Sequence, residues 1–448
     1  MKFLLILFLL FFCASLTNVS AQAKKVFPYN YKVEDLPNGL RVVTVPTDYK
    51  NLVSLYIVVG AGSRNEVEAN KSGYAHFFEH LMFRGSENFA PGRFDEVMKK
   101  AGASSNAYTS DDRTVYHETF AKEDLEEVMQ LEADRFQRLK FSEEQFKTEA
   151  GAVLGEYNKN SASPTFKMSE VLRETSFRKH TYSHTTMGYL ADIKDYPNQY
   201  EYAFQFFERF YRPENTTIVI VGDIKGPEVS KMVKNYWSEW KRGDYKQQIP
   251  SEPAQDKPRS QNIEWASQTL PHIAVGYRGP AFSETDKDKV ALDLLAAIAF
   301  GENSDIYQKL VLQEQKAVWI APEFGNNLDP ELFSVWSQVK DVNDLSYVKG
   351  EIVKTLQKYS TELIPLKQLT ETRSRQRYGF AMAMNSNDAI AGTLAAFVAL
   401  RRSPDTIDKL FALYDTVTPE DIRAAAKKYF KENNQTTVTL STKNGGAK

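Results

Sequence analysis

The sequence has little of several features that would define a specialised class of protein. Its 448 residues include one cysteine, Cys13, which excludes a disulfide framework and thiol chemistry in the rest of the chain. Glycine (22 residues) and proline (18 residues) are too sparse for a collagenous or low-complexity protein. The formal net charge of −2 excludes the strong basic field with which proteins hold nucleic acids. What remains is an ordinary globular composition, 42% hydrophobic and 25% charged.

Only the N-terminus carries a long hydrophobic run. Phe3–Phe12 follows a single lysine and precedes Val19-Ser20-Ala21, the pattern of a secretory signal peptide. The run is about half the length that a membrane-spanning helix needs. We therefore predict a signal peptide over 1–21, no transmembrane span in the mature chain, and export to the periplasm, with the extracellular space as the alternative compartment. An uncleaved membrane anchor is the alternative for this segment.

The rest of the chain alternates strand and helix patterns and contains a weak internal repeat. Val53–Gly62 has its counterpart in His272–Gly279, and Asn215–Gly222 has its counterpart in Asn433–Ser441, at nearly equal separations. We predict an α+β fold of two homologous α/β-sandwich domains, each an antiparallel-rich sheet with packed helices. The predicted units are an N-terminal domain over 27–245, a proline-containing linker over 246–262 and a C-terminal domain over 263–445.

One segment carries residues suited to metal chemistry. His76 and His80 lie four residues apart, so on a helix they share one face, with Glu79 beside them. Two imidazoles at this spacing can hold one Zn²⁺, and an adjacent carboxylate that is not a ligand can take a proton from water on the metal. The competing interpretation, a pair of core histidines, would bury these polar groups without partners.

A catalytic zinc ion needs a third protein ligand and an open fourth position. Glu149 and Glu156 are two helical turns apart, so both can face the same way. One could bind the metal while the other orients a ligating histidine. The spacing alone does not choose between them.

The motif His76-x-x-Glu79-His80, followed 76 residues later by Glu156, resembles the inverted zinc motif of the pitrilysin/insulinase-type (M16) metallopeptidases. By this resemblance Glu156 is the third ligand, and Glu149 is a carboxylate that supports the ligands without binding the metal. Further segments that resemble the family are Leu36–Leu40, Gly62–Glu66, Phe83–Ser86, Asn106–Tyr116 and Tyr211–Asn215.

The resemblance implies a half-clamshell fold and one Zn²⁺ per chain, with Glu79 activating water for peptide hydrolysis. It also implies that Asn106, Ala107 and Thr109 belong to an edge strand that holds an extended peptide by strand addition. The implied protein is an exported zinc-dependent endopeptidase that hydrolyses unfolded oligopeptides.

The sequence departs from the family pattern in its second half. Active members often carry an arginine and a tyrosine seven residues apart, whereas this chain has Val311 and then Val318 or Trp319 at the matching positions. We therefore expect a dimer, and specifically a heterodimer in which a related second subunit supplies the Arg/Tyr pair. A non-catalytic M16-like subunit that binds peptides or scaffolds a complex is the alternative function.

Two more histidines, His180 and His184, also lie four residues apart. Neither has an acidic residue close by in the sequence. We predict that they are surface or loop histidines rather than metal ligands.

Overall fold

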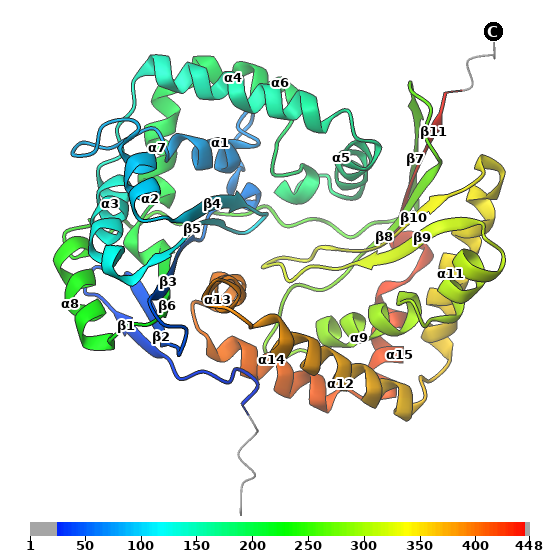
Figure 1. The fold of residues 1–448 in the computed structure, drawn as a ribbon. Coiled ribbons are helices and arrows are strands. Elements are labelled where there is room, and N and C mark those ends of the chain that lie inside the picture. The colour runs from blue at the N-terminus through cyan, green and yellow to red at the C-terminus, as the bar shows by residue number, and fades with distance from the viewer. Residues whose placement is uncertain (1–24, 444–448) are drawn as a thin grey trace, which may run out of the picture.

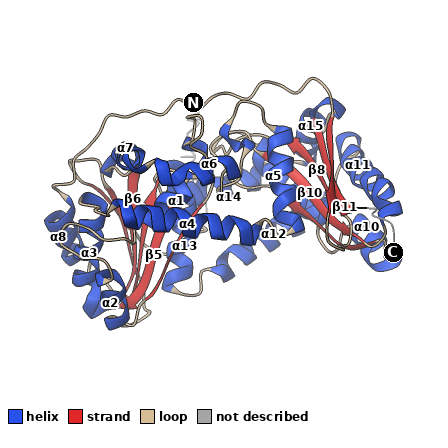
Figure 2. Cartoon of the chain, turned by 90° about the horizontal axis from the view of Figure 1, so that it is seen from above, coloured by secondary structure: helices blue, strands red, loops and turns tan. Residues whose placement is uncertain are grey.

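The computed structural model describes residues 25–443, so the predicted signal peptide over 1–21 lies outside the described residues. The fold is α+β, as predicted, and contains two mixed sheets (Figure 1). The strand order is β1-β2-β6-β3-β5-β4 in the first sheet and β7-β11-β8-β10-β9 in the second. Figure 2 shows the two sheets at opposite ends of the molecule, with helices between them. Among residues 25–443 no helix combines the length and the apolar character needed to cross a membrane.

The elements of the first half are β1 (Lys32–Asp35), β2 (Arg41–Pro46), β3 (Leu52–Val59), α1 (Tyr74–Leu81), α2 (Arg93–Lys100), β4 (Ser104–Thr109), β5 (Thr114–Ala121), α3 (Leu125–Gln137), α4 (Glu143–Asn160), α5 (Pro164–Ser176), α6 (Leu190–Asp195), α7 (Tyr200–Phe210), β6 (Thr216–Gly222) and α8 (Gly226–Trp237). Those of the second half are β7 (Arg259–Trp265), β8 (His272–Arg278), α9 (Asp288–Phe300), α10 (Asp305–Tyr307), β9 (Ala317–Glu323), β10 (Leu332–Val339), α11 (Leu345–Thr361), α12 (Leu366–Ala383), α13 (Asn387–Arg401), α14 (Asp405–Thr416), α15 (Pro419–Tyr429) and β11 (Gln435–Thr442).

The two sheets share one topology. β2 runs parallel to β6 and β7 runs parallel to β11, whereas the other neighbouring strands are antiparallel. When β3 is matched to β8 and β6 to β11, every strand of the second sheet has a counterpart at the same place in the first. The first sheet adds only β1. The matched strands contain the segments that the sequence paired, so the internal repeat is confirmed.

Each half contributes a helix to the sheet of the other half. α13, from the second half, packs on β3 and β6, where Ile390 and Leu394 are fully buried in one apolar cluster with Val219. α5, from the first half, packs on β7, β8 and β11, where Met168 lies in a cluster with Val438. Since burying apolar surface is the main stabilising term in folding, this exchange joins the halves into one packed unit.

The turn that ends β4 is held by a loop of the second half. Asp112, in the β4–β5 turn, accepts hydrogen bonds from the Leu328 N–H at 2.8 Å and from the Tyr182 hydroxyl at 2.7 Å. Asp329, in the β9–β10 loop, lies 2.9 Å from the His180 ring. The prediction that His180 and His184 lie at the surface is wrong, because both are buried. The acidic partner of His180 is distant in sequence and therefore was not visible there.

The predicted linker is ordinary irregular backbone over most of its length. β7 begins at Arg259, so the last four residues of the 246–262 segment are strand. Upstream of that strand, the Glu252 carboxylate accepts the backbone N–H groups of Arg178, Lys179 and His180. The exact domain boundaries stay a prediction.

Candidate metal centre

Helix α1 carries the two histidines, and its start is fixed by close packing. Gly73 precedes it in the left-handed region, with φ of 78°, and a Cβ there would meet the Met187 carbonyl oxygen at 2.3 Å. The buried Glu66 carboxylate accepts the N–H groups of Gly73 (2.5 Å) and Ala75 (2.7 Å), which satisfies donors that the first turn leaves free. The apolar face of the helix is fully buried through Tyr74, Phe77, Phe78 and Leu81. The direction in which His76 and His80 project is therefore set by the core.

Helix α4 carries the two glutamates and passes over α1 (Figure 1). Its N-terminus is closed by a capping box, in which Ser142 and Gln145 exchange hydrogen bonds between side chain and backbone. Its apolar face, which includes Phe146 and Val153, is buried. Seven residues make two turns, so Glu149 and Glu156 both face α1, as the spacing predicted.

Three side chains converge on one point. The Nε2 atoms of His76 and His80 lie 3.6 Å and 3.5 Å from Glu156 Oε2. Both distances exceed an ordinary N–H···O hydrogen bond. Donor atoms bonded to one tetrahedral Zn²⁺ at 2.0–2.1 Å lie about 3.3–3.4 Å apart. Within residues 25–443, these three residues form the one group of His, Cys, Asp or Glu side chains with such convergence. The donor set and spacing fit a zinc ion.

Burial keeps the His76 ring in its neutral form. Burial, together with the neighbouring His80, lowers the pKa of His76 to about 4, so the imidazole is neutral near pH 7. A neutral ring nitrogen is the form that binds a metal. The other ring nitrogen, Nδ1, is buried without a hydrogen-bond partner among the described residues.

A second carboxylate, that of Glu149, contacts the other ring nitrogen of His80. Its Nδ1 atom lies 3.4 Å from Glu149 Oε2, and Arg84 Nε lies 3.3 Å from the other oxygen of that carboxylate. Burial alone would lower the pKa of His80, but Glu149, Glu79 and Glu156 outweigh it and raise the pKa overall. Sequence reasoning missed Arg84, although its position four residues after His80 could have indicated it.

Glu79 lies beside the three convergent side chains and is bonded to the sheet. Its Oε2 atom accepts a hydrogen bond of 2.6 Å from the Thr109 hydroxyl. Burial raises the pKa of Glu79, and the bond from Thr109 opposes this shift. A raised pKa suits a group that takes up a proton during a reaction.

β4 forms one edge of the first sheet, and β1 forms the other. Ser110 donates its N–H to the Arg113 carbonyl at the hairpin, and the antiparallel pattern alternates from there. By this alternation the backbone groups of Ala107 and Thr109 point away from β5. Consistent with this, the Ala107 N–H is bonded to the side chain of Asn106 at 2.9 Å. The three residues predicted to bind peptide thus lie along an edge that offers unpaired backbone groups.

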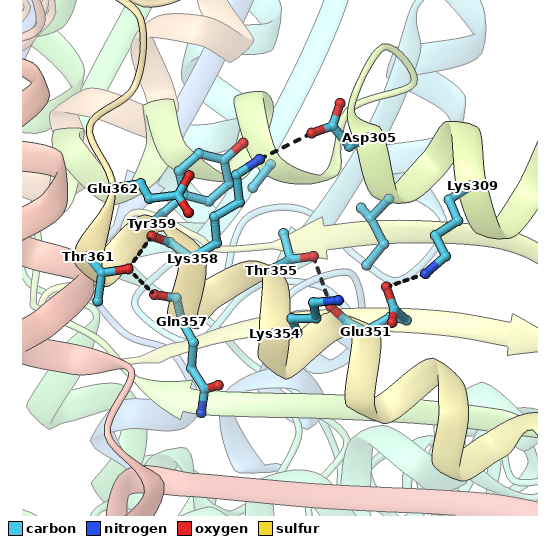
Figure 3. A pocket seen from close by; sticks show the side chains of 12 residues that line it. Asp305, Lys309, Glu351, Lys354, Thr355, Gln357, Lys358, Tyr359, Thr361 and Glu362 are labelled. Carbon is cyan, nitrogen blue, oxygen red and sulfur yellow. Dashed lines mark hydrogen bonds and ion pairs between the residues drawn. The ribbon is translucent and has the colours of Figure 1, made fainter.

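Two cavities differ in their relation to this centre. One, of about 430 Å³, adjoins it: Phe83, Arg84, Asn106 and Glu149 are among its lining residues. The other, of about 570 Å³, lies in the second half between α9, α10 and α11 (Figure 3). It contains none of the predicted site residues, and its charged side chains pair with one another in Lys309–Glu351 and Lys358–Asp305.

Known proteins resemble the chain over nearly its whole length. Zinc protease PqqE of Helicobacter pylori is 29% identical, over 94% of this chain and 95% of that protein. A probable mitochondrial-processing peptidase subunit beta of Arabidopsis thaliana is 25% identical, over 89% of this chain and 76% of its own. The crystal structure of a protease from Helicobacter pylori superposes with a TM-score of 0.85 and 28% identity, covering 92% of this chain and 99% of that one.

Two family models match the chain in succession. The model described as Insulinase (Peptidase family M16) matches residues 41–189, a range that includes His76, Glu79, His80 and Glu156. The model described as Peptidase M16 inactive domain matches residues 198–375. With the zinc-compatible centre in the first match and four of the five strands of the second sheet in the second, the chain belongs to peptidase family M16.

Proposed function

We propose that this protein is an exported zinc-dependent endopeptidase that hydrolyses unfolded oligopeptides. The observation that carries the proposal is the convergence of His76, His80 and Glu156 at zinc-ligand spacing, with the non-ligating Glu79 alongside. Three protein ligands leave the fourth position open, as in catalytic rather than structural zinc sites. Zinc proteases among the relatives support the same chemistry.

In this proposal His76, His80 and Glu156 would hold one Zn²⁺, which supplies Lewis-acid activation of water and of the scissile carbonyl. Glu79 takes the proton of the attacking water and passes it to the departing amine. Its Oε2 atom is bonded to Thr109, so Oε1 is the oxygen free to accept the proton. Glu149 orients the ring of His80 through Nδ1, and Arg84 holds Glu149 in turn.

The edge of β4 is the proposed peptide-binding element. A peptide added to this edge would pair with the backbone of Ala107 and Thr109 after displacing the Asn106 side chain from the Ala107 N–H. Backbone pairing discriminates little between side chains. It does require an extended chain, so folded proteins would be poor substrates.

The proposed assembly is a dimer, and specifically a heterodimer with a related subunit. Val311, Val318 and Trp319 stand where active members carry the Arg/Tyr pair, so a second chain would complete the substrate chamber. A processing peptidase relative is named as a subunit, which supports this arrangement. The N-terminal sequence pattern supports export, with the periplasm as the proposed compartment.

The test uses the purified mature chain, a pool of quenched fluorescent peptides and an assay of bound zinc. With a co-purified M16-like partner present, we expect chelator-sensitive cleavage that Glu79→Gln abolishes while zinc content is retained, whereas normal turnover by the chain alone would contradict the heterodimer. Glu143→Gln is the matched control, because Glu143 lies on α4 and, among residues 25–443, forms its one ion pair with Lys147 on the surface. Zinc binding without cleavage, with and without a co-purified M16-like partner, would refute the proposal and favour the non-catalytic subunit.

A further inference from the structure

The Thr109 side chain joins the proposed peptide-binding strand to the proposed general base. Thr109 is the last residue of β4, and its backbone faces the free edge of the sheet. Its side chain stands out from the plane of the sheet, and the hydroxyl donates to Glu79 Oε2, on α1, at 2.6 Å. One residue thus touches both the strand that would bind the peptide and the carboxylate that would act on water.

The surrounding hydrogen bonds favour donation of the Thr109 hydroxyl proton to Glu79 rather than to Thr114. A second oxygen within hydrogen-bond distance is the Thr114 hydroxyl, at 3.3 Å. Thr114 donates its own proton to the Ala61 carbonyl at 2.9 Å. A hydroxyl has one proton, and a bond to a carboxylate is shorter and stronger than a bond to a neutral oxygen. The 2.6 Å contact is therefore the bond that Thr109 makes.

The orientation of the Glu79 carboxylate depends largely on its hydrogen bond with Thr109. Among residues 25–443, Thr109 is the one side chain that donates a hydrogen bond to it. The carboxylate belongs to a helix, whereas the peptide would lie on a sheet edge. Without a link, small movements of α1 against β4 would change the distance between base and substrate, and misplacements of about 1 Å can cost 100-fold in rate.

We propose that Thr109 is a positioning residue, whose hydroxyl fixes Glu79 relative to the strand that carries the peptide. The inference rests on the proposed peptidase function and assigns to this side chain a role separate from the backbone pairing of β4. It predicts an effect on the chemical step rather than on peptide affinity, because the substitution leaves the backbone of the edge unchanged.

The experiment compares Thr109→Val, Thr109→Ser and wild type in steady-state cleavage of one peptide that the wild type cleaves. Valine keeps the shape and removes the hydroxyl, so we expect kcat to fall about 10- to 100-fold with KM changed less than about threefold. Serine restores the donor, and we expect kcat within about threefold of wild type. Zinc content and thermal melting of each variant check that the centre and the fold persist.

Tyr108→Phe is the matched control. It also removes a hydroxyl from β4, but the Tyr108 ring packs toward His117 on the other face of the strand. We expect its kcat to equal that of the wild type.

Equal kcat in wild type and in a folded, zinc-loaded Thr109→Val would overturn the inference, and so would failure of Thr109→Ser to recover. A fall in affinity alone, with kcat unchanged, would likewise contradict it. These outcomes require an active wild type. A wild type that cleaves no peptide with or without a partner refutes the proposed function itself, and with it this inference.

Discussion

The stability of the first half should depend on pH through one buried glutamate. Arg135 on α3 is buried with two carboxylates, Glu132 at 2.7 Å and Glu118 at 3.4 Å, both fully buried. One guanidinium cannot neutralise two carboxylates, and an uncompensated buried charge is costly. Burial and the charge of Glu132 raise the pKa of Glu118 well above its ordinary value of 4.5, against the opposing effect of Arg135. Glu118 therefore keeps its proton in the folded protein at pH values where the unfolded chain has lost it.

The sign and size of the effect follow from proton linkage. Below pH 4.5 both states hold the proton, and the contribution of Glu118 to stability is complete. As the pH rises, the unfolded chain releases the proton while the folded protein retains it, so the free energy of unfolding falls by about 1.4 kcal/mol per pH unit. The fall ends at the folded pKa. Glu118→Gln has no proton to retain, so this slope should vanish from the variant.

Urea unfolding of wild type and Glu118→Gln at pH 5, 6 and 7 measures the difference. Glutamine resembles the protonated acid in shape. We therefore expect the free energy of unfolding of the variant, relative to that of the wild type, to rise by about 1.4 kcal/mol per pH unit. Parallel pH profiles would refute the argument, because they would mean that Glu118 is ionised in both states. Glu132→Gln is the contrasting control: it removes the carboxylate charge that faces two N–H groups of Arg135, and we expect it to lose about 2–3 kcal/mol.

Two further substitutions test the centre and the exchanged helix. Glu149→Gln should weaken zinc affinity about 10- to 100-fold, because it loosens the support behind His80. Competition with a chromophoric chelator measures this, and unchanged affinity would contradict the role given to Glu149. Leu394→Ala should destabilise the protein by about 2–5 kcal/mol, because this side chain of α13 is fully buried against the first sheet. Thermal or urea unfolding measures the loss, with Leu312→Ala, 53% exposed, as the control that should change little.

The buried Arg135 also contacts aromatic side chains near the candidate metal centre. The Arg135 guanidinium lies 4.8 Å from the ring centroids of both Phe83 and Phe94, which line the cavity beside the candidate metal centre. Cation–π contacts of this kind hold aromatic rings in place when the cation is desolvated. Variants of Glu132 should therefore be assayed for zinc content as well as for stability, since a shift of Phe83 could reach the adjacent α1.

The sequence by itself determined the features that depend on local periodicity. His76 and His80 share a helix face because four residues make about one turn, and Glu149 and Glu156 share a face because seven make two. The strand repeat was visible because buried strands read as continuous apolar runs, and it predicted the two matching sheets. Assigning Glu156 rather than Glu149 as ligand needed the family resemblance, because both glutamates satisfy the same spacing.

Only the tertiary structure decided which distant residues meet. The exchange of α5 and α13 between the halves cannot be seen in either helix, because an apolar face does not specify the sheet that covers it. Asp329 lies 149 residues from His180, so the buried state of that histidine depends on how a loop of the second half packs. The bond between Thr109 and Glu79 likewise spans 30 residues and two elements. Local patterns set the direction of a side chain along its own element, whereas the partner at its tip is set by packing between elements.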